Sequence, residues 1–164
     1  MSGATRLRPP RNWLDHRVMA WWRAQVGVLT AVVVVPLLIL GLLIAPARPW
    51  FLIPAAVLAV AGLLGILLLP PWWFRIHRWE VTDQAVYTRG GVLWQVWRVA
   101  PMSRIQTVDT VRGPLQRAFG LSTVTVTTAS SAGAVKIEGL DHEQAAELAE
   151  ELTRITHDTP GDAT

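Results

Sequence analysis

Cysteine is absent from this chain of 164 residues. Its absence excludes a disulfide-stapled secreted scaffold, an iron–sulfur protein and an enzyme that works through a thiolate. Charge is scarce as well, because charged residues make up 16% of the chain whereas apolar residues make up 51%. Such a composition excludes a disordered acidic or basic tail. The length suits a small soluble domain together with membrane segments.

Acidic residues are nearly missing from the first half of the chain. Residues 1–78 hold eight arginines and a single acid, Asp15, whereas residues 79–164 hold seven Lys and Arg and eleven acids. This asymmetry separates a basic membrane part from a mildly acidic soluble part. An acidic soluble part argues against nucleic acid as its partner.

Two long runs, Gln25–Ala45 and Phe51–Leu69, contain no charged residue and no histidine. A helix of about 20 residues reaches roughly 30 Å, the thickness of the hydrocarbon core. The connector Pro46–Trp50 has room only for a tight turn. We therefore expect a transmembrane helical hairpin over residues 25–71, with spans at about 25–45 and 51–69. The lack of ionisable groups inside the spans argues against a proton-coupled transporter.

Arginines flank both ends of the predicted hairpin, while its turn carries only Arg48. Positive residues stay on the cytoplasmic side, so we expect a multi-pass inner-membrane protein with both termini in the cytoplasm. The tripeptide Ala45-Pro46-Ala47 resembles a signal peptidase site. However, the apolar run before it is longer than in a signal peptide, and a second span follows at once.

Tryptophans cluster where the membrane interfaces should lie, which suits indole rings at the headgroup level. With the neighbouring arginines, the predicted membrane-interface anchors are Trp13, Arg17, Trp21, Trp22, Arg23, Trp50, Trp72, Trp73 and Arg75. Residues 1–24 form a basic juxtamembrane segment. Within it, the apolar spacing of residues 11–23 predicts an amphipathic helix along the inner leaflet, where arginines could attract anionic lipid. Alternatively, these charges only set the topology.

Small residues recur four apart in both spans, which lets helix backbones approach closely. The pairs are Gly27/Ala31, Gly41/Ala45, Ala55/Ala59 and Ala61/Gly65. We favour packing of the two helices of the hairpin on each other, because a bare hairpin needs such a contact. An oligomer interface is the alternative.

From Trp79 onward the apolar period changes to two, which is typical of strands. The predicted strands are Ile76–Thr82, Ala85–Arg89, Val92–Val99, Arg104–Val111, Leu121–Thr128 and Ala134–Glu138, with a loop over 130–133 and a helical turn over 114–119. Asp83-Gln84 and Gly90-Gly91 suit two-residue hairpin turns. Asp141 is a good N-cap for an amphipathic helix of about 16 residues that packs on the sheet. We expect this domain over residues 72–158 and a disordered tail over 159–164.

Four stretches resemble the bacterial PH-like membrane proteins of the YdbS-like family. They are LDHRVMAWWR, RWEVTDQAVYTRGGVLWQ, RIQTVDTVRGPLQRAFGLSTVTVTTA and IEGL. The resemblance implies an α+β fold in which the hairpin is followed by a bent PH-type β-sandwich of about seven strands, capped by a C-terminal helix. Six strands are predicted above, so the seventh is expected within a merged strand or in the Trp72–Ile76 junction. The resemblance also implies no enzyme activity, no cofactor and a protein partner, either a second copy or a larger protein with several PH-like domains. A role in envelope stress or bacteriocin tolerance is implied as well.

No motif for catalysis or metal binding stands in the chain. His142-Glu143 begins a zinc-protease-like pattern, but Ala146 occupies the place of its second histidine. We therefore predict no catalytic, cofactor-binding or metal-binding residues. Eukaryotic PH domains grip inositol phosphates with clustered Lys and Arg in their first hairpin, whereas the matching hairpin here offers only Arg89 and Arg98.

Polar and aromatic residues around the fourth predicted strand suggest a surface for a partner. The candidates are Arg104, Gln106, Arg112, Gln116, Arg117, Trp94 and Trp97. The alternative is that this segment shapes a bend and fills the core. The favoured prediction is a membrane-tethered interaction and assembly module that performs no chemistry. A second prediction is an oligomeric pore or export component built from the hairpin. An enzyme of lipid metabolism would need acids or histidines near the bilayer, where the junction Trp72–Glu80 offers only His77 and Glu80.

Overall fold

The computed structural model describes residues 10–91, 94–129 and 133–158. The first nine residues of the basic segment, the predicted strand start at Val92, most of the 130–133 loop and the 159–164 tail lie outside the described residues. The chain divides into two compact units. One contains residues 16–72, and the other contains the residues before 16 and those from 73 onward.

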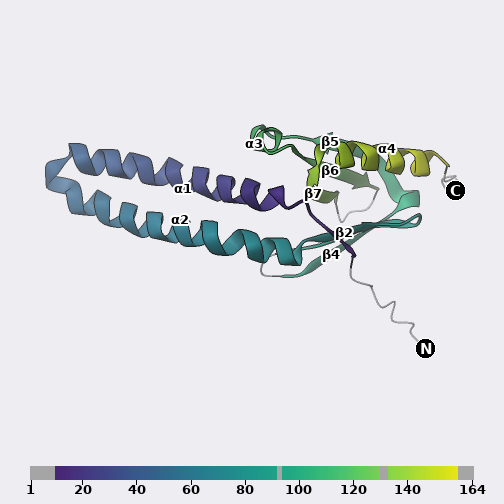
Figure 1. Cartoon of the computed structure of the whole chain (residues 1–164), viewed down its shortest axis with the longest axis horizontal. Coiled ribbons are helices and arrows are strands. Elements are labelled where there is room, and N and C mark those ends of the chain that lie inside the picture. The colour runs from purple at the N-terminus through teal and green to yellow at the C-terminus, as the bar shows by residue number, and fades with distance from the viewer. Residues whose placement is uncertain (1–9, 92–93, 130–132, 159–164) are drawn as a thin grey trace, which may run out of the picture. The chain divides into compact units, whose positions relative to one another are not determined.

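The first unit is a helical hairpin. Helix α1 (Arg17–Leu43) is followed by the short helix η1 (Ala45–Ala47) and by α2 (Arg48–Ile76), which runs back alongside α1 (Figure 1). Both helices are long and apolar enough to cross a membrane. Most of their large aliphatic side chains are exposed, as lipid-facing residues are. A long apolar helix thus lies over each predicted span. Helix α1 begins before its predicted span and ends two residues short of it, whereas α2 extends beyond its span at both ends.

The helices of this hairpin approach each other closely at two glycines. A Cβ atom added to Gly41 would lie 2.7 Å from Leu52 Cδ2, and one added to Gly62 would lie 2.9 Å from Thr30 Cβ. Ala55 is fully buried. Small residues therefore permit the contact within the hairpin, in agreement with the favoured interpretation of the small-residue pairs.

The second unit begins with a four-stranded antiparallel sheet. Its order is β1 (Asn12–Trp13), β2 (Arg78–Val81), β3 (Ala85–Gly90) and β4 (Val96–Pro101). The seventh strand is thus β1, upstream of the hairpin. Both expected places for it were wrong. Each of the six predicted strands overlaps a single observed strand, and the Trp72–Ile76 junction belongs to the end of α2.

Strand β1 also changes the interpretation of the N-terminal segment. Asn12 and Trp13 pair with Trp79 and Arg78 of β2, so helix begins only at Arg17 and not at Arg11. The whole hairpin is therefore an insertion between two adjacent strands of one sheet. Both ends of the hairpin therefore connect to the same sheet.

A three-stranded antiparallel sheet, a short helix and a terminal helix complete this unit. The sheet has the order β5 (Ile105–Val111), β6 (Leu121–Thr128), β7 (Val135–Asp141). Helix η2 (Met102–Arg104) joins the two sheets, and α3 (Pro114–Ala118) joins β5 to β6.

Helix α4 (His142–Asp158) covers the second sheet and contacts all three of its strands. Its N-terminus is capped as predicted, because the Glu143 amide donates to Asp141 Oδ1 at 3.0 Å. The core lies between the sheets and under this helix, and its buried residues include Val86, Ala100, Leu121, Val124, Val126, Ile137, Leu140, Ala145, Leu148 and Leu152. This is the expected α+β fold, a PH-like sandwich closed by a C-terminal helix.

Candidate functional site

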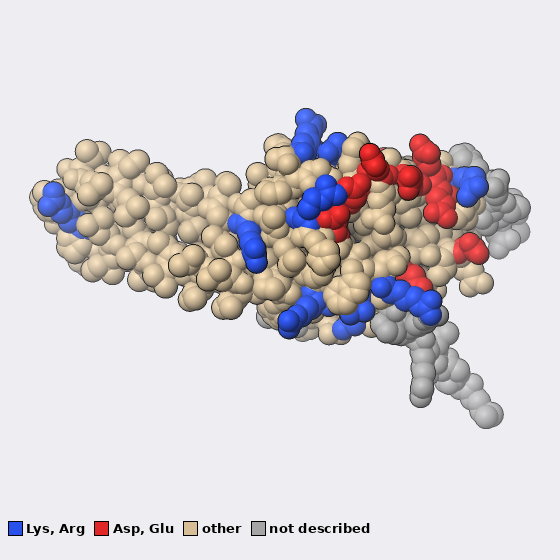
Figure 2. Space-filling view, viewed as in Figure 1, with Lys and Arg blue, Asp and Glu red and all other residues tan. Residues whose placement is uncertain are grey.

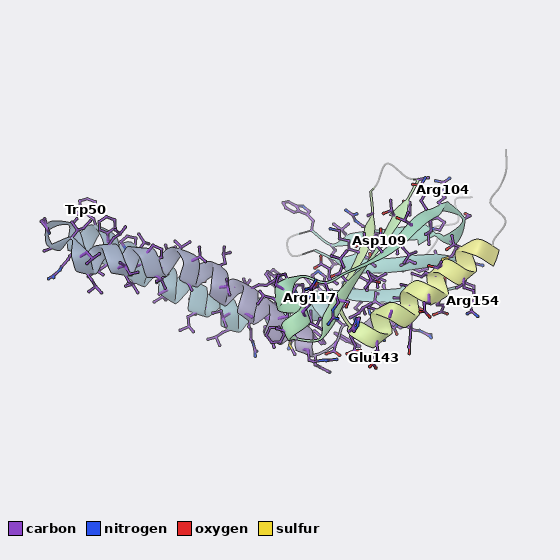
Figure 3. All side chains as sticks on the ribbon, turned by 90° about the horizontal axis from the view of Figure 1, so that it is seen from above. Trp50, Arg104, Asp109, Arg117, Glu143 and Arg154 are labelled. Carbon is purple, nitrogen blue, oxygen red and sulfur yellow. The ribbon has the colours of Figure 1, made fainter. Side chains whose placement is uncertain are left out.

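The residues of the predicted partner surface lie at opposite ends of β5, so the length of this strand separates them. Arg104 ends η2 just before β5, and Gln106 is the second residue of β5, whereas Arg112 and Arg117 follow the end of β5. A strand of seven residues spans about 23 Å. Figure 3 shows Arg104 and Arg117 at different ends of the sheet. The structure therefore does not bring these side chains into one patch.

Gln116 lies inside the domain, with 6% of its surface exposed. Its Nε2 donates to Thr123 Oγ1 at 2.8 Å, and its Oε1 accepts a hydrogen bond from the Gly113 amide at 2.9 Å. Arg112 is similarly engaged, since its Nε donates to the Leu121 carbonyl oxygen at 3.2 Å. Both residues fix the bend between β5 and β6, which agrees with the alternative interpretation of this segment.

The two candidate tryptophans differ in exposure. Trp94 is 77% exposed, in the connection between β3 and β4. Trp97 is half-buried on β4, where the guanidinium of Arg89 lies 5.3 Å from the ring centroid. Trp94 is therefore the available contact residue of the pair.

A groove follows the edge of the first sheet. Among the described strands, β4 pairs only with β3, so one side of its backbone is free. The groove has a volume of about 560 Å³, and Val96, Val99 and Arg104 line it together with residues of β6 and β7. Val96 and Val99 are exposed. We call this the β4 edge groove, and it unites two of the predicted surface residues, Trp97 and Arg104.

Aromatic and basic residues alternate in a row across the first sheet. Trp13 on β1 pairs with Arg78 on β2, Arg78 pairs with Arg89 on β3, and Arg89 pairs with Trp97 on β4. Directly paired residues lie on the same face of a sheet. We call these four residues the Trp–Arg row. Figure 2 shows Lys and Arg gathered over the β2–β4 sheet, while Asp and Glu gather over α4.

A cleft of about 430 Å³ adjoins the Trp–Arg row. Four cationic residues line it, each from a different strand, and Glu138 is the carboxylate among its described lining residues. The cations are Arg78, Arg89, Arg98 and Lys136. Arg98 pairs with Thr88, so its side chain lies on the sheet face opposite to those of Arg78 and Arg89. Gly91 also lines this cleft. Its φ of 105° lies in the left-handed region, which favours glycine at this position. We call this the basic cleft.

The predicted membrane anchors fall into buried and exposed groups. Trp21 and Trp22 are buried, with ring centroids 6.4 Å apart, and Trp13 stacks on Phe74 at 5.6 Å. The exposed anchors are Trp13, Trp50 at the tip of the hairpin in Figure 3, Arg17, Arg23, Trp72 and Arg75. Trp73 is half-buried. The exposed rings are those that could reach headgroups.

The comparison with protein families decides the classification. Residues 23–156 match the bacterial PH domain family, from within α1 to the end region of α4. The chain belongs to this family. It is also 28% identical over 160 residues to the UPF0699 transmembrane protein YdbS of Bacillus subtilis (strain 168), covering 93% of this chain and 97% of that protein. No solved structure matches the chain.

The chain is therefore a membrane protein with a bacterial PH domain, similar to YdbS over most of its length. Within the described residues, no three His, Asp or Glu side chains come together as a metal site would require. His142 instead lies 3.4 Å from Ser122 Oγ through its Nδ1.

The sequence analysis did not predict the basic cleft of this bacterial PH domain. One feature of the sequence nevertheless indicated that Arg78 and Arg89 lie side by side. The predicted Asp83-Gln84 turn fixes the register of β2 against β3 and so places Arg78 opposite Arg89. Lys136 of the basic cleft and Trp13 of the Trp–Arg row could not be added in this way, because their strands are distant in sequence from that turn.

Proposed function

We propose that this protein is a membrane-tethered interaction module whose PH-like domain binds a partner protein along the β4 edge groove. The hairpin fixes the position of the domain at the bilayer, and the domain performs no chemistry. The free backbone of β4 is the observation that supports this function most directly. An unpaired strand edge presents N–H and C=O groups to which an extended segment can add.

The groove also suggests the character of the partner segment. Val96 and Val99 offer apolar contact, while Arg98 and Arg104 place positive charge on the same groove. A strand with alternating apolar and acidic residues is complementary to this surface. The proposed partner is a larger membrane protein with several PH-like domains, and a second copy of this chain is the other occupant to test.

The proposed location is the inner membrane, with both termini and the domain in the cytoplasm. The arginines that flank the hairpin support this orientation, because positive residues stay on the cytoplasmic side. A role in envelope stress or bacteriocin tolerance belongs to the same proposal, and its support is the YdbS-like family resemblance alone.

Cross-linking in native membranes tests the partner surface, and the absence of cysteine makes single-cysteine variants clean reporters. Val99→Cys places a thiol in the groove, and Glu147→Cys places one on the exposed face of α4 as the matched control. We expect the Val99→Cys variant to form a cross-link to a second PH-domain protein, and the Glu147→Cys variant to form none. Equal products from both variants, or none from Val99→Cys, would contradict the proposal.

The same experiment addresses the pore alternative through Val57→Cys, an exposed position on α2. A ladder of identical cross-linked spans would favour a pore or export component. The apolar exposed faces of both helices favour the tethering function instead, since a pore wall usually requires polar groups.

A further inference from the structure

The Trp–Arg row places two positive charges directly opposite each other. Arg78 on β2 pairs with Arg89 on β3, and like charges at directly opposed positions destabilise a sheet. Among the described residues, no carboxylate forms an ion pair with either guanidinium. The repulsion between these side chains is therefore not neutralised within the part of the domain that the structure describes.

Each arginine of the row stacks on the tryptophan beside it. The Arg78 guanidinium lies 3.8 Å from the centroid of the Trp13 ring, and the Arg89 guanidinium lies 5.3 Å from that of Trp97. Stacking on an aromatic face leaves the in-plane N–H donors of a guanidinium available to a ligand. The row therefore holds two cations in place without consuming their hydrogen-bond capacity.

The Nε atom of Arg89 is a second observation that points to a ligand. This atom is buried and makes no hydrogen bond within the described residues. Buried polar atoms are nearly always paired, so an unpaired one points to a ligand, an ion or a water. Arg98 pairs with Thr88 and lies on the opposite face of the sheet, where its Nη1 donates to the Ala134 carbonyl oxygen at 2.7 Å, so it takes no part in the row.

The chain connectivity ties the row to the bilayer surface. Arg78 follows the last residue of α2 by two positions, which is about 7 Å of chain. Helix α2 has 29 residues and is about 44 Å long, close to the roughly 40–45 Å of a bilayer with its headgroups. The row is thus tethered within reach of headgroup phosphates.

We propose that the Trp–Arg row binds a phosphate group, held by the guanidiniums of Arg78 and Arg89. Paired guanidiniums suit phosphate oxygens because each offers two parallel N–H donors. The phosphate belongs either to an anionic phospholipid or to a small soluble phosphate. This site goes beyond the partner surface proposed above and does not depend on it.

Thermal unfolding of the full chain in a nonionic detergent tests the site. The probes are phosphatidylglycerol, phosphatidylcholine, glycerol phosphate and inorganic phosphate. At saturation we expect phosphatidylglycerol to raise Tm by about 5 °C. A matching rise with glycerol phosphate or inorganic phosphate would assign the site to a soluble phosphate. No rise with any phosphate, or an equal rise with phosphatidylcholine, would overturn the proposal.

Matched variants locate the effect. We expect the pair Arg78→Gln and Arg89→Gln to abolish the rise, and the control pair Arg104→Gln and Arg117→Gln, which removes two exposed cations outside the basic cleft, to retain it. If the first pair does not fold, Arg78→Lys with Arg89→Lys keeps both charges but lacks the forked geometry and should bind about tenfold more weakly. A full response in either Arg78/Arg89 variant would show that the row is not the site.

Discussion

Single residues in this domain take roles that residue type alone did not reveal. Gln116 and Arg117 are neighbours in α3, and both were candidates for a partner surface. The structure buries the first in two hydrogen bonds and leaves the second exposed. Helical periodicity is uninformative over a helix of five residues, so the sequence could not decide which side chain points inward.

This difference gives a prediction at the residue scale. Gln116→Ala removes the partner of Thr123 Oγ1 and of the Gly113 amide, and we expect it to lower the free energy of unfolding by about 1–3 kcal/mol. Arg117→Ala should change it by less than about 0.5 kcal/mol. Thermal unfolding followed by tryptophan fluorescence compares the two variants. Equal stabilities would contradict the structural role given to Gln116.

Elements with strong local patterns were predicted well. The two spans follow from length and the absence of charge, the six longer strands from a period of two, and α4 from its apolar stripe and its cap. Strand β1 was missed because it has only two residues and because its partners in β2 lie 65 and 67 positions away along the chain. Its neighbours Leu14 and Val18 fit a helical spacing, so local periodicity favoured the wrong element.

The helical hairpin offers a prediction at the element scale. An alanine at Gly62 would place its Cβ against Thr30, whose branched side chain is stiff, whereas the nearest atom to an added Cβ at Gly27 is Ile66 Cδ1 at 3.7 Å. We expect Gly62→Ala to destabilise the hairpin by about 1–3 kcal/mol and Gly27→Ala to be neutral or slightly stabilising.

The stability of the hairpin in both full-length variants is measured by the loss of the helical circular dichroism signal as the SDS concentration rises. A Gly62→Ala protein as resistant as the Gly27→Ala protein would show that the close approach of α1 and α2 at Thr30 is absent.

At the scale of the whole molecule, the insertion of the hairpin between β1 and β2 is the feature with the widest consequence. Both crossings of the bilayer begin at one sheet, so the PH-like domain cannot be separated from the membrane by a flexible linker at either end. The exposed Trp50 lies at the far tip of the hairpin. The whole account therefore requires Trp50 and the domain to lie on opposite sides of the membrane.

Thiol labelling of intact cells tests this requirement most directly, since the chain has no cysteine of its own. Trp50→Cys should react with a membrane-impermeant maleimide added outside, and Arg117→Cys should react only after the inner membrane has been permeabilised. Labelling of Arg117→Cys in intact cells would contradict the account. So would a Trp50→Cys variant that does not react in intact cells.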